Sequence, residues 1–264
     1  QLQFDLYQQH LPRARPDEPV IVVSIDNQGI ERYGRWPWSR QIMADLLGRI
    51  STGQPLAIGF DLVFPENDHY SQAELTRHLP GVAPALLKQI ADPDQQLAEA
   101  LMSEPTVLAA IAVSNALPGT RIPARDHLPG STFTTLPAAV SRYPTAILSL
   151  PTFEAQAAGS GLINASPDRL QGTVERGVLR SLPAIALVNE QALLSLPLEM
   201  LRVALLFKNG PPAPTISVEQ DGAGLKQIRI GDYHLPLQAN GEILLHYGAA
   251  SSHYYLSAVD VLDG

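Results

Sequence analysis

The sequence predicts an α/β fold: a mixed, largely parallel central sheet with flanking helices, followed by strand-rich C-terminal hairpins. Three observations predict it. Short β-branched or apolar runs alternate with amphipathic helical segments over the first 113 residues, the order typical of a sheet covered by helices. A proline-rich stretch then separates this part from the rest. From residue 215 on, alternating runs surround Asp221-Gly222 and Asn240-Gly241, the dipeptides of hairpin turns.

The first elements follow one another closely. Residues 2–11 have helical spacing of apolar side chains. Residues 20–25 form a continuous β-branched run, which predicts a strand covered on both faces. Residues 40–50 carry an apolar stripe of helical period, and residues 56–64 form a second apolar run. Strand, helix and strand at this length predict a right-handed βαβ unit with neighbouring parallel strands.

The next elements continue the alternation. Residues 66–91 are a long polar excursion, with helix expected around 83–90. Asp92-Pro93 predicts a helix start, because Asp caps helices and Pro is favoured at the first helical position. Residues 106–113 are apolar throughout and predict a third, buried strand.

The second half is harder to assign. Residues 114–160 contain six prolines spread along the stretch and are expected to be loop with short elements. Residues 161–165 and 178–182 are expected to pair as a hairpin. Residues 184–207 are the longest apolar region, but polar residues interrupt it. They therefore predict a helix of the globular fold, kinked at Pro197, and not a membrane span.

Composition limits the function. The 264 residues are 45% hydrophobic and 17% charged, which is typical of a folded globular chain. A net charge of −8 argues against nucleic acid as a partner and against a polybasic membrane patch. The absence of cysteine excludes disulfides, thiolate catalysis and Cys-ligated metals. The chain starts at Gln1 without a signal peptide, so it is expected to be part of a longer protein.

Two carboxylates stand out in the predicted βαβ unit. Asp26 ends the first strand and Asp61 lies in the second, near the edge where open α/β sheets bind ligands. One interpretation is a ligand or cation site made of paired carboxylates. The other is structural: Asp26 caps the turn at 27–29, and Asp61 accepts hydrogen bonds from the backbone or from Arg40.

The segment between these carboxylates contains Trp36-Pro37-Trp38 followed by Ser39-Arg40. It could be an aromatic recognition surface, since Trp and Arg are favoured at interfaces. The alternative is a helix entry in which Pro37 and Ser39 set the start and the indoles cover the sheet. Arg40 is the candidate partner of Asp61 or of an anionic ligand.

Asn164, Asp168 and Arg180 form a second candidate cluster, in which Pro167-Asp168 is also a turn signal. The histidines lack zinc-binding spacing, and the chain has no G-x-S-x-G elbow, P-loop or G-x-G-x-x-G. We therefore predict no catalytic residue, no metal and no cofactor. Two other hypotheses remain: an Mg²⁺-dependent phosphohydrolase using Asp26 and Asp61, and a ligand-free spacer that organises dimers.

Several motifs together resemble a known family. They are VIVVSID at 20–26, GRWPWSR at 34–40, AIGFDLVFPE at 57–66, GLIN at 161–164 with Pro167-Asp168, VLRSLP at 178–183, ILLHYG at 243–248 and SAVDVL at 257–262. This set resembles the second CHASE-type domain, the cyclase/histidine-kinase-associated sensory extracellular module. The chain departs from the family pattern at Ser181, where a second Arg is common, at His246, where Asn is common, and in a longer segment 169–177.

The resemblance implies one sensor domain over residues 1–264 that faces the periplasm or the extracellular space. Its parts would be a membrane-proximal helix and linker (1–16), a βαβ core (17–113), the proline-rich insert (114–160) and a C-terminal part (161–264). A final strand and the flanking membrane helices of the family are absent from this sequence. The domain would be no enzyme, but a homodimeric module that controls a cytoplasmic cyclase, diguanylate cyclase or kinase.

The stimulus implied by the resemblance is an unidentified small molecule or protein. The residues expected to bind it are Asp26, Trp36, Trp38, Arg40, Asp61, Asn164 and Asp168.

Overall fold

The computed structural model describes residues 20–115, 136–165, 179–248 and 255–264. The elements up to residue 113 are β1 (Val22–Ser24), α2 (Asn27–Tyr33), α3 (Arg40–Ser51), β2 (Ile58–Phe60), α4 (Gln72–His78), α5 (Pro84–Leu87), α6 (Pro93–Ser103) and β3 (Thr106–Val113). Those that follow are β4 (Arg142–Tyr143), β5 (Thr145–Ile147), α8 (Pro151–Gln156), β6 (Gly159–Leu162), β7 (Ser181–Pro183), β8 (Ile185–Val188), β9 (Gln191–Leu194), α9 (Leu196–Asn209), β10 (Ile216–Asp221), β11 (Gly224–Ile230), β12 (Tyr233–Pro236), β13 (Glu242–Leu244), β14 (Tyr255–Ser257) and α10 (Ala258–Asp263).

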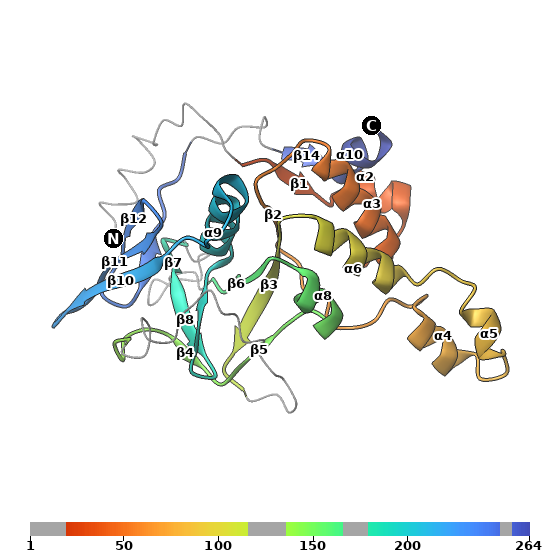
Figure 1. Cartoon of the computed structure of the whole chain (residues 1–264), viewed down its shortest axis with the longest axis horizontal. Helices are drawn as coiled ribbons and strands as arrows, with labels where there is room; N and C mark the ends of the chain where they lie inside the picture. The colour runs from red at the N-terminus through yellow and green to blue at the C-terminus, as the bar shows by residue number, and fades with distance from the viewer. Residues whose placement is uncertain (1–19, 116–135, 166–178, 249–254) are drawn as a thin grey trace, which may run out of the picture.

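The centre of the molecule is a mixed sheet, which confirms the predicted fold class (Figure 1). β3 lies between β2 and β6 and runs parallel to both, while β5 pairs antiparallel with the far end of β3. An isolated bridge between Leu162 and Ser195 connects this sheet to the β4-β8-β9 sheet. The predicted helix 40–50, the helix start at Asp92-Pro93 and the strand 106–113 are confirmed.

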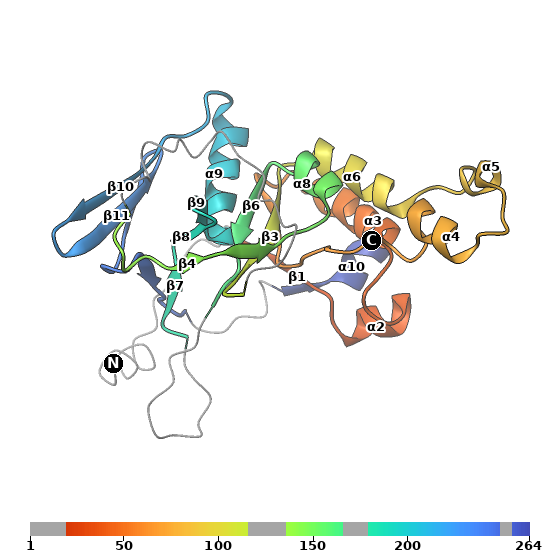
Figure 2. The ribbon, with the colours of Figure 1, turned by 90° about the horizontal axis from the view of Figure 1, so that it is seen from below.

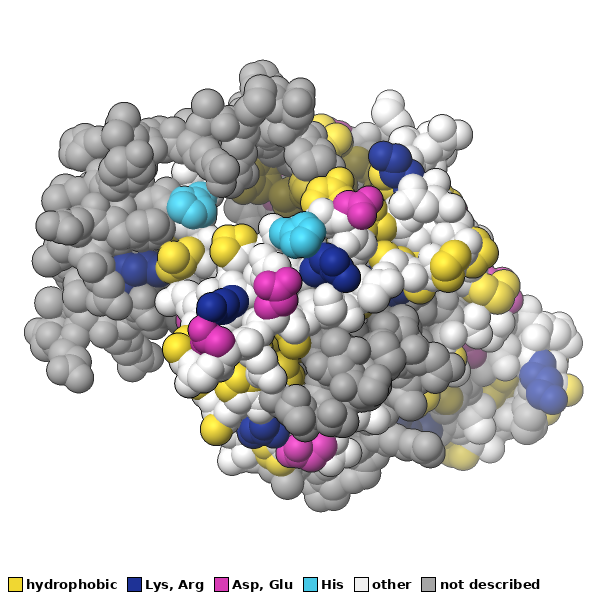
Figure 3. Space-filling view, turned by 60° about the vertical axis from the view of Figure 1, so that its left-hand side comes forward, with side chains coloured by type: hydrophobic (Ala, Val, Ile, Leu, Met, Phe, Trp, Pro, Cys, Tyr) yellow, Lys and Arg dark blue, Asp and Glu magenta, His cyan; other side chains and the backbone are white. Residues whose placement is uncertain are grey.

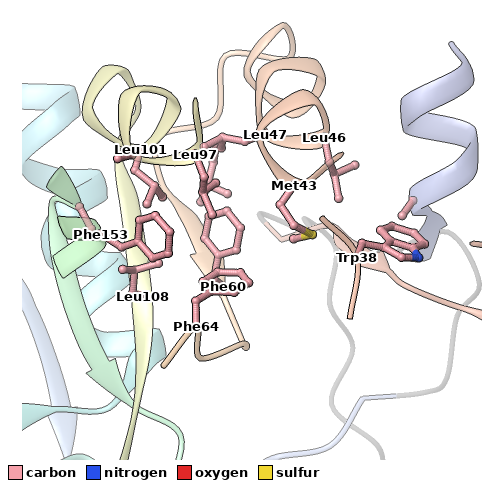
Figure 4. Close-up of a cluster of buried hydrophobic side chains, with 14 residues drawn as sticks. Trp38, Met43, Leu46, Leu47, Phe60, Phe64, Leu97, Leu101, Leu108 and Phe153 are labelled. Atoms are coloured by element: carbon pink, nitrogen blue, oxygen red, sulfur yellow. The ribbon is translucent and has the colours of Figure 1, made fainter. Parts of the chain in front are cut away.

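One face of the central sheet is covered by α3, α6 and α8. Their buried side chains meet Phe60 of β2 and Leu108 of β3 (Figure 4). The helix residues in this cluster are Met43, Leu46 and Leu47 of α3, Leu97 and Leu101 of α6, and Phe153 of α8. Because neighbours along a strand point to opposite faces, Gly59 and Val107 point to the other side of the sheet.

Helix α9 lies on that other face, directly over strand backbone. A Cβ atom added to Gly59 of β2, or to Gly159 or Gly161 of β6, would come within 3 Å of an α9 atom. For Gly161 the obstructing atom is the Cα of Leu196, which is backbone. The three glycines therefore form a flat surface that lets α9 approach the sheet closely.

The predicted βαβ unit is wrong in its first strand. β1 pairs in parallel with β14, whereas β2 pairs with β3. Val20 and Ile21 are 57% and 61% exposed, so the β-branched run is not covered on both faces. The partner of β1 comes from the last ten residues of the chain. Local sequence patterns do not reveal a pairing between segments so far apart.

The predicted hairpin between 161–165 and 178–182 is also wrong. β6 pairs in parallel with β3, and β7 pairs antiparallel with β13. The glycines of β6 explain its central position, because a strand without large side chains can lie beneath α9.

The predicted helix 184–207 is correct only in its second part. Residues 185–194 form the hairpin β8–β9, and α9 begins at Leu196 with Pro197 in its first turn, where it is tolerated without a kink. Asn189 and Glu190 adopt positive φ angles of 48° and 59°, the conformation of a two-residue hairpin turn. A fully buried strand and a buried helix segment share the same apolar pattern, which explains the error.

The remaining elements form two projections. β10, β11 and β12 are an antiparallel sheet that packs one face against α9, and the predicted turn at Asp221-Gly222 joins its first two strands. Charged and histidine side chains are interspersed on this side of the molecule (Figure 3). At the opposite end, α4 and α5 stand away from the body (Figures 1 and 2). Within the described ranges, no helix is long and apolar enough to cross a membrane.

Candidate functional site

Two strand–helix units from opposite ends of the described chain lie side by side. β1 leads into α2, β14 leads into α10, and the two strands pair in parallel register from Val22 with Tyr255 to Ser24 with Ser257. We call β1, α2, β14 and α10 the terminal clasp. Ala258 of α10 is fully buried against the α3 side of the core. The clasp is therefore part of the folded body.

Asp26 joins the two units at the strand ends. One carboxylate oxygen accepts hydrogen bonds from the Gly29 N–H at 3.0 Å and from the Ser257 hydroxyl at 3.1 Å. Ser257 in turn caps α10, accepting from the Val259 N–H at 3.2 Å. The Gly29 N–H is the main cause that lowers the pKa of Asp26. The predicted capping role of Asp26 is confirmed, although it caps a helix and not a simple turn.

A second contact ties the helix ends together. The Tyr33 hydroxyl donates to one oxygen of Asp263 at 2.6 Å, and the Arg32 Nε lies 3.3 Å from the other. The Tyr33 hydrogen bond is the main cause that lowers the pKa of Asp263, and the same bond raises the pKa of Tyr33. The Arg32 and Asp263 side chains are exposed, so salt and pH act on this contact directly.

The two tryptophans differ in exposure. Trp38 is 2% exposed and its indole N–H donates to the Gly34 carbonyl at 3.0 Å, while Trp36 is half-buried. The Trp38 ring packs edge-on against Tyr33 and Trp36, at centroid distances of 5.4 and 6.0 Å. Ser39 caps α3, as the helix-entry interpretation predicts. Trp38 is therefore a core residue beneath α2.

Arg40 does not pair with Asp61, so that prediction is wrong. Its guanidinium donates to the Glu66 carbonyl at 3.2 Å and lies 4.6 Å from the centre of the Phe64 ring. Arg40 is only 7% exposed, and this burial lowers its pKa. Asp61 directly follows β2 and is exposed. The chain after β2 turns Phe64 and Glu66, and not Asp61, toward Arg40.

Three aspartates between β2 and the first turn of α6 organise the starts of three helices. Asp68 accepts from the Arg40 N–H of α3 at 2.6 Å, and its own N–H donates to Asp94 of α6 at 3.1 Å. Asp92 accepts from the Gln72 N–H of α4 at 3.2 Å. Burial is the main cause that raises the pKa of Asp94. Only Asp92 was identified from the sequence, because the adjacent proline marks it as a cap.

A buried ion pair in α9 was also missed. Glu199 and Arg202 are 1% exposed each and lie 2.8 Å apart, and Arg202 also donates to the Ala158 carbonyl at 3.0 Å. Their spacing of three residues within an apolar stretch was the available signal. The pair fixes α9 to the segment that precedes β6.

The second predicted cluster is only partly described. The Asn164 side chain makes two hydrogen bonds of 2.8 Å to the backbone N–H and carbonyl of Ala112, so it continues the pairing of β6 with β3. Arg180 is buried. Asp168, like the predicted helix 2–11, lies outside the described residues.

The six predicted ligand-binding residues that lie in the described ranges occupy separate places in the fold. Asp26, Trp36, Trp38 and Arg40 surround the α2–α3 connection, whereas Asp61 and Asn164 follow two different strands. Their ligand-binding role stays a prediction. The described residues include no group of three or more His, Asp or Glu side chains placed to hold a metal ion.

Comparison with known proteins gives one result. The family model described as the CHASE2 domain matches residues 1–263. The searches of curated proteins and of solved structures found no match.

Proposed function

Because this chain belongs to the CHASE2 domain family, whose members are sensory modules of receptors, we propose that it is the extracytoplasmic sensor of a bacterial membrane receptor. In this proposal the terminal clasp passes the state of the domain to a cytoplasmic cyclase, diguanylate cyclase or kinase. The domain itself is not an enzyme, and the output activity belongs to a separate domain.

The parallel pairing of β1 with β14 is the observation that carries this proposal. A sensor between membrane segments can act on them only through the two places where its chain enters and leaves. In the described part of the chain, the first strand and the last strand share one small sheet and the Asp26–Ser257 hydrogen bond, which supports placing both connections at the clasp. A rearrangement of the clasp therefore changes both connections at once.

A stimulus, whether a small molecule or a protein, must bind two arrangements of the domain with different affinity. A difference of about 1.4 kcal/mol changes their ratio tenfold. In this proposal the two arrangements differ in exposed hydrogen bonds of the terminal clasp, such as the one from Tyr33 to Asp263.

A reversible lock tests the proposal. Val22 and Tyr255 are register partners with exposed side chains, and neighbouring strands bring their Cα atoms within disulfide range. The chain has no cysteine of its own. In the receptor carrying Val22→Cys with Tyr255→Cys, we expect oxidation to fix the basal output at one level, and reduction to restore the response.

The matched control is Arg229→Cys with His234→Cys, an exposed register pair of β11 and β12 far from the clasp. Oxidising this pair should leave the output unchanged. An output that ignores the Val22–Tyr255 disulfide, in receptor shown to be inserted and oxidised, contradicts the role of the clasp.

A further inference from the structure

Residues 69–91, which we call the arm, project from the body and are fixed at their base. The arm contains α4 and α5, which pack chiefly against each other and stand away from the rest of the chain in both ribbon views (Figures 1 and 2). Hydrogen bonds connect its two ends. The Asp68 N–H donates to both carboxylate oxygens of Asp94 at 3.2 and 3.1 Å, and the Gln72 N–H donates to Asp92 at 3.2 Å. The position of the arm therefore depends on a few bonds that end on carboxylates.

Three carboxylates and one buried cation meet at this base. Asp68 is 5% exposed and accepts from the Arg40 N–H at 2.6 Å and from the Tyr70 N–H at 2.8 Å. The charge of the buried Arg40 side chain acts on Asp68 and Asp94. Its Nε is buried without a hydrogen-bond partner among the described residues, so the cation is incompletely matched to the carboxylates around it. With Asp68, Asp92 and Asp94 all ionised, the base has an excess of negative charge.

Asp94 is the carboxylate of this group whose ionisation is least favourable. Burial is the main cause that raises its pKa, and the charges of Asp92 and Asp68 raise it further. The bond from the Asp68 N–H and the charge of Arg40 act in the opposite direction. A half-buried carboxylate between two like charges gains when it takes up a proton.

The other charged groups of the neighbouring elements are engaged elsewhere or exposed. Glu154 of α8 accepts from the Ser160 hydroxyl at 2.5 Å, and Glu74 of α4 pairs with Arg77. The remaining acidic, basic and histidine side chains of α3, α4, α6 and the loop after β2 are exposed: Asp45, Arg49, Asp61, Glu66, His69, His78 and Glu99. The charge balance at the base is therefore set by Arg40 and the three aspartates.

We propose that Asp94 is a proton-controlled latch for the arm: the neutral carboxyl holds the arm against the body, and the ionised carboxylate loosens it. Protonation removes one of three like charges, yet the group keeps a carbonyl oxygen that can accept the bond from the Asp68 N–H. When the arm loosens, water solvates the carboxylate, so the closed arrangement binds the proton more tightly.

The direction of the pH dependence follows from the raised pKa of Asp94 in the closed arrangement. The stabilisation of the closed arm is complete below the ordinary aspartate value of about 4, and it is lost as pH rises through the raised value. The latch is a property of the folded chain itself. It goes beyond the proposed sensory role and does not depend on it.

Hydrogen exchange of the purified chain, followed by mass spectrometry, tests the latch. The readout is the exchange rate of the amides of residues 68–72, divided by their intrinsic rate at each pH. In the wild type we expect these amides to become more protected as pH falls from about 7 towards about 4. Asp94→Asn imitates the neutral carboxyl. In this variant the same amides should exchange at least about threefold more slowly than in the wild type near neutral pH, and the pH dependence should be lost.

Asp45→Asn is the matched control, because it removes the same charge from an exposed position of α3 and should leave residues 68–72 unchanged. Peptides of β3 should stay protected throughout, which excludes global unfolding as the cause.

Three results would each overturn the proposal: wild-type protection that does not rise as pH falls, an Asp94→Asn variant that exchanges as fast as the wild type, or an equal effect of Asp45→Asn. If Asp94→Asn does not fold, the wild-type pH series decides alone. None of these measurements involves a receptor output, so the proposed function is tested separately.

Discussion

At the scale of single residues, several aspartates in the described ranges accept hydrogen bonds from backbone N–H groups. Asp92 could be predicted, because the following proline fixes it as a cap. Asp26 was predicted as a cap, but α2 behind it was not, since Gly29 weakens the helical pattern. The role of Asp68 could not be predicted, because the N–H group that donates to it belongs to Arg40, 28 residues earlier in the chain.

Asn164 gives a prediction at this scale. Replacing it with Ala leaves the N–H and carbonyl of Ala112 without partners, which should cost about 1–3 kcal/mol in the free energy of unfolding. Asn164→Asp should also destabilise at neutral pH, because a carboxylate repels the Ala112 carbonyl. Once protonated, the carboxyl group can donate a hydrogen bond to the Ala112 carbonyl. The difference between the free energies of unfolding of wild type and Asn164→Asp should therefore shrink as pH falls.

Urea unfolding at a series of pH values measures this effect. Asn115→Asp is the control, because Asn115 is exposed just after β3 and should show no such pH-dependent deficit. Equal behaviour of the two variants would contradict the role assigned to the Asn164 amide.

At the scale of elements, helical period and capping identified α3 and α6, whose apolar stripes face the sheet. The same reasoning failed for residues 185–194, because a buried hairpin and a buried helix have the same composition. The short strand GSGL was predicted only in its second half, as part of a strand at 161–165, and with the wrong partner, although the close approach of α9 requires its small residues.

Gly161 tests the packing of α9. A Cβ at this position would lie 2.5 Å from backbone of Leu196, which cannot rotate away as a side chain could. We therefore expect Gly161→Ala to lower the free energy of unfolding by about 1–3 kcal/mol or more.

Gly48→Ala is the matched control for this prediction. Gly48 lies inside α3 with no other atom within 4 Å of its added Cβ, so alanine should stabilise the protein by about 0.5–1 kcal/mol. Denaturant unfolding of both variants provides the measurement. The same sign for both substitutions would refute the argument from close approach.

At the scale of the whole molecule, local patterns predicted the fold class and the central strand but not which distant strands meet. Asp26 and Ser257 are 231 residues apart, and nothing near either residue indicates the other. The family motifs include both ends of the chain, yet they do not say that these ends pair. Asp26 was therefore singled out from the sequence, while the pairing of β1 with β14 beside it was not.

The clasp should respond to acid before the core does. The pKa values of Asp26 and Asp263 are both lowered, chiefly by the hydrogen bonds from Gly29 and Tyr33. A lowered folded-state pKa means that the stabilisation is complete above the ordinary aspartate value. It is lost as pH falls from about 4 through the folded-state pKa values.

Hydrogen exchange with mass spectrometry can locate this loss. Peptides covering β1 and β14 should lose protection at a pH at which β3, buried between β2 and β6, remains protected. Asp26→Asn keeps an acceptor for Gly29 but removes one of the two titrating groups, so its clasp should open over a narrower pH range. If β1, β14 and β3 lose protection together in the wild type, the two chain ends have no separate stability. In that case the clasp could not rearrange as a unit while the core stays folded. Its proposed role requires such a rearrangement, so this result would contradict it.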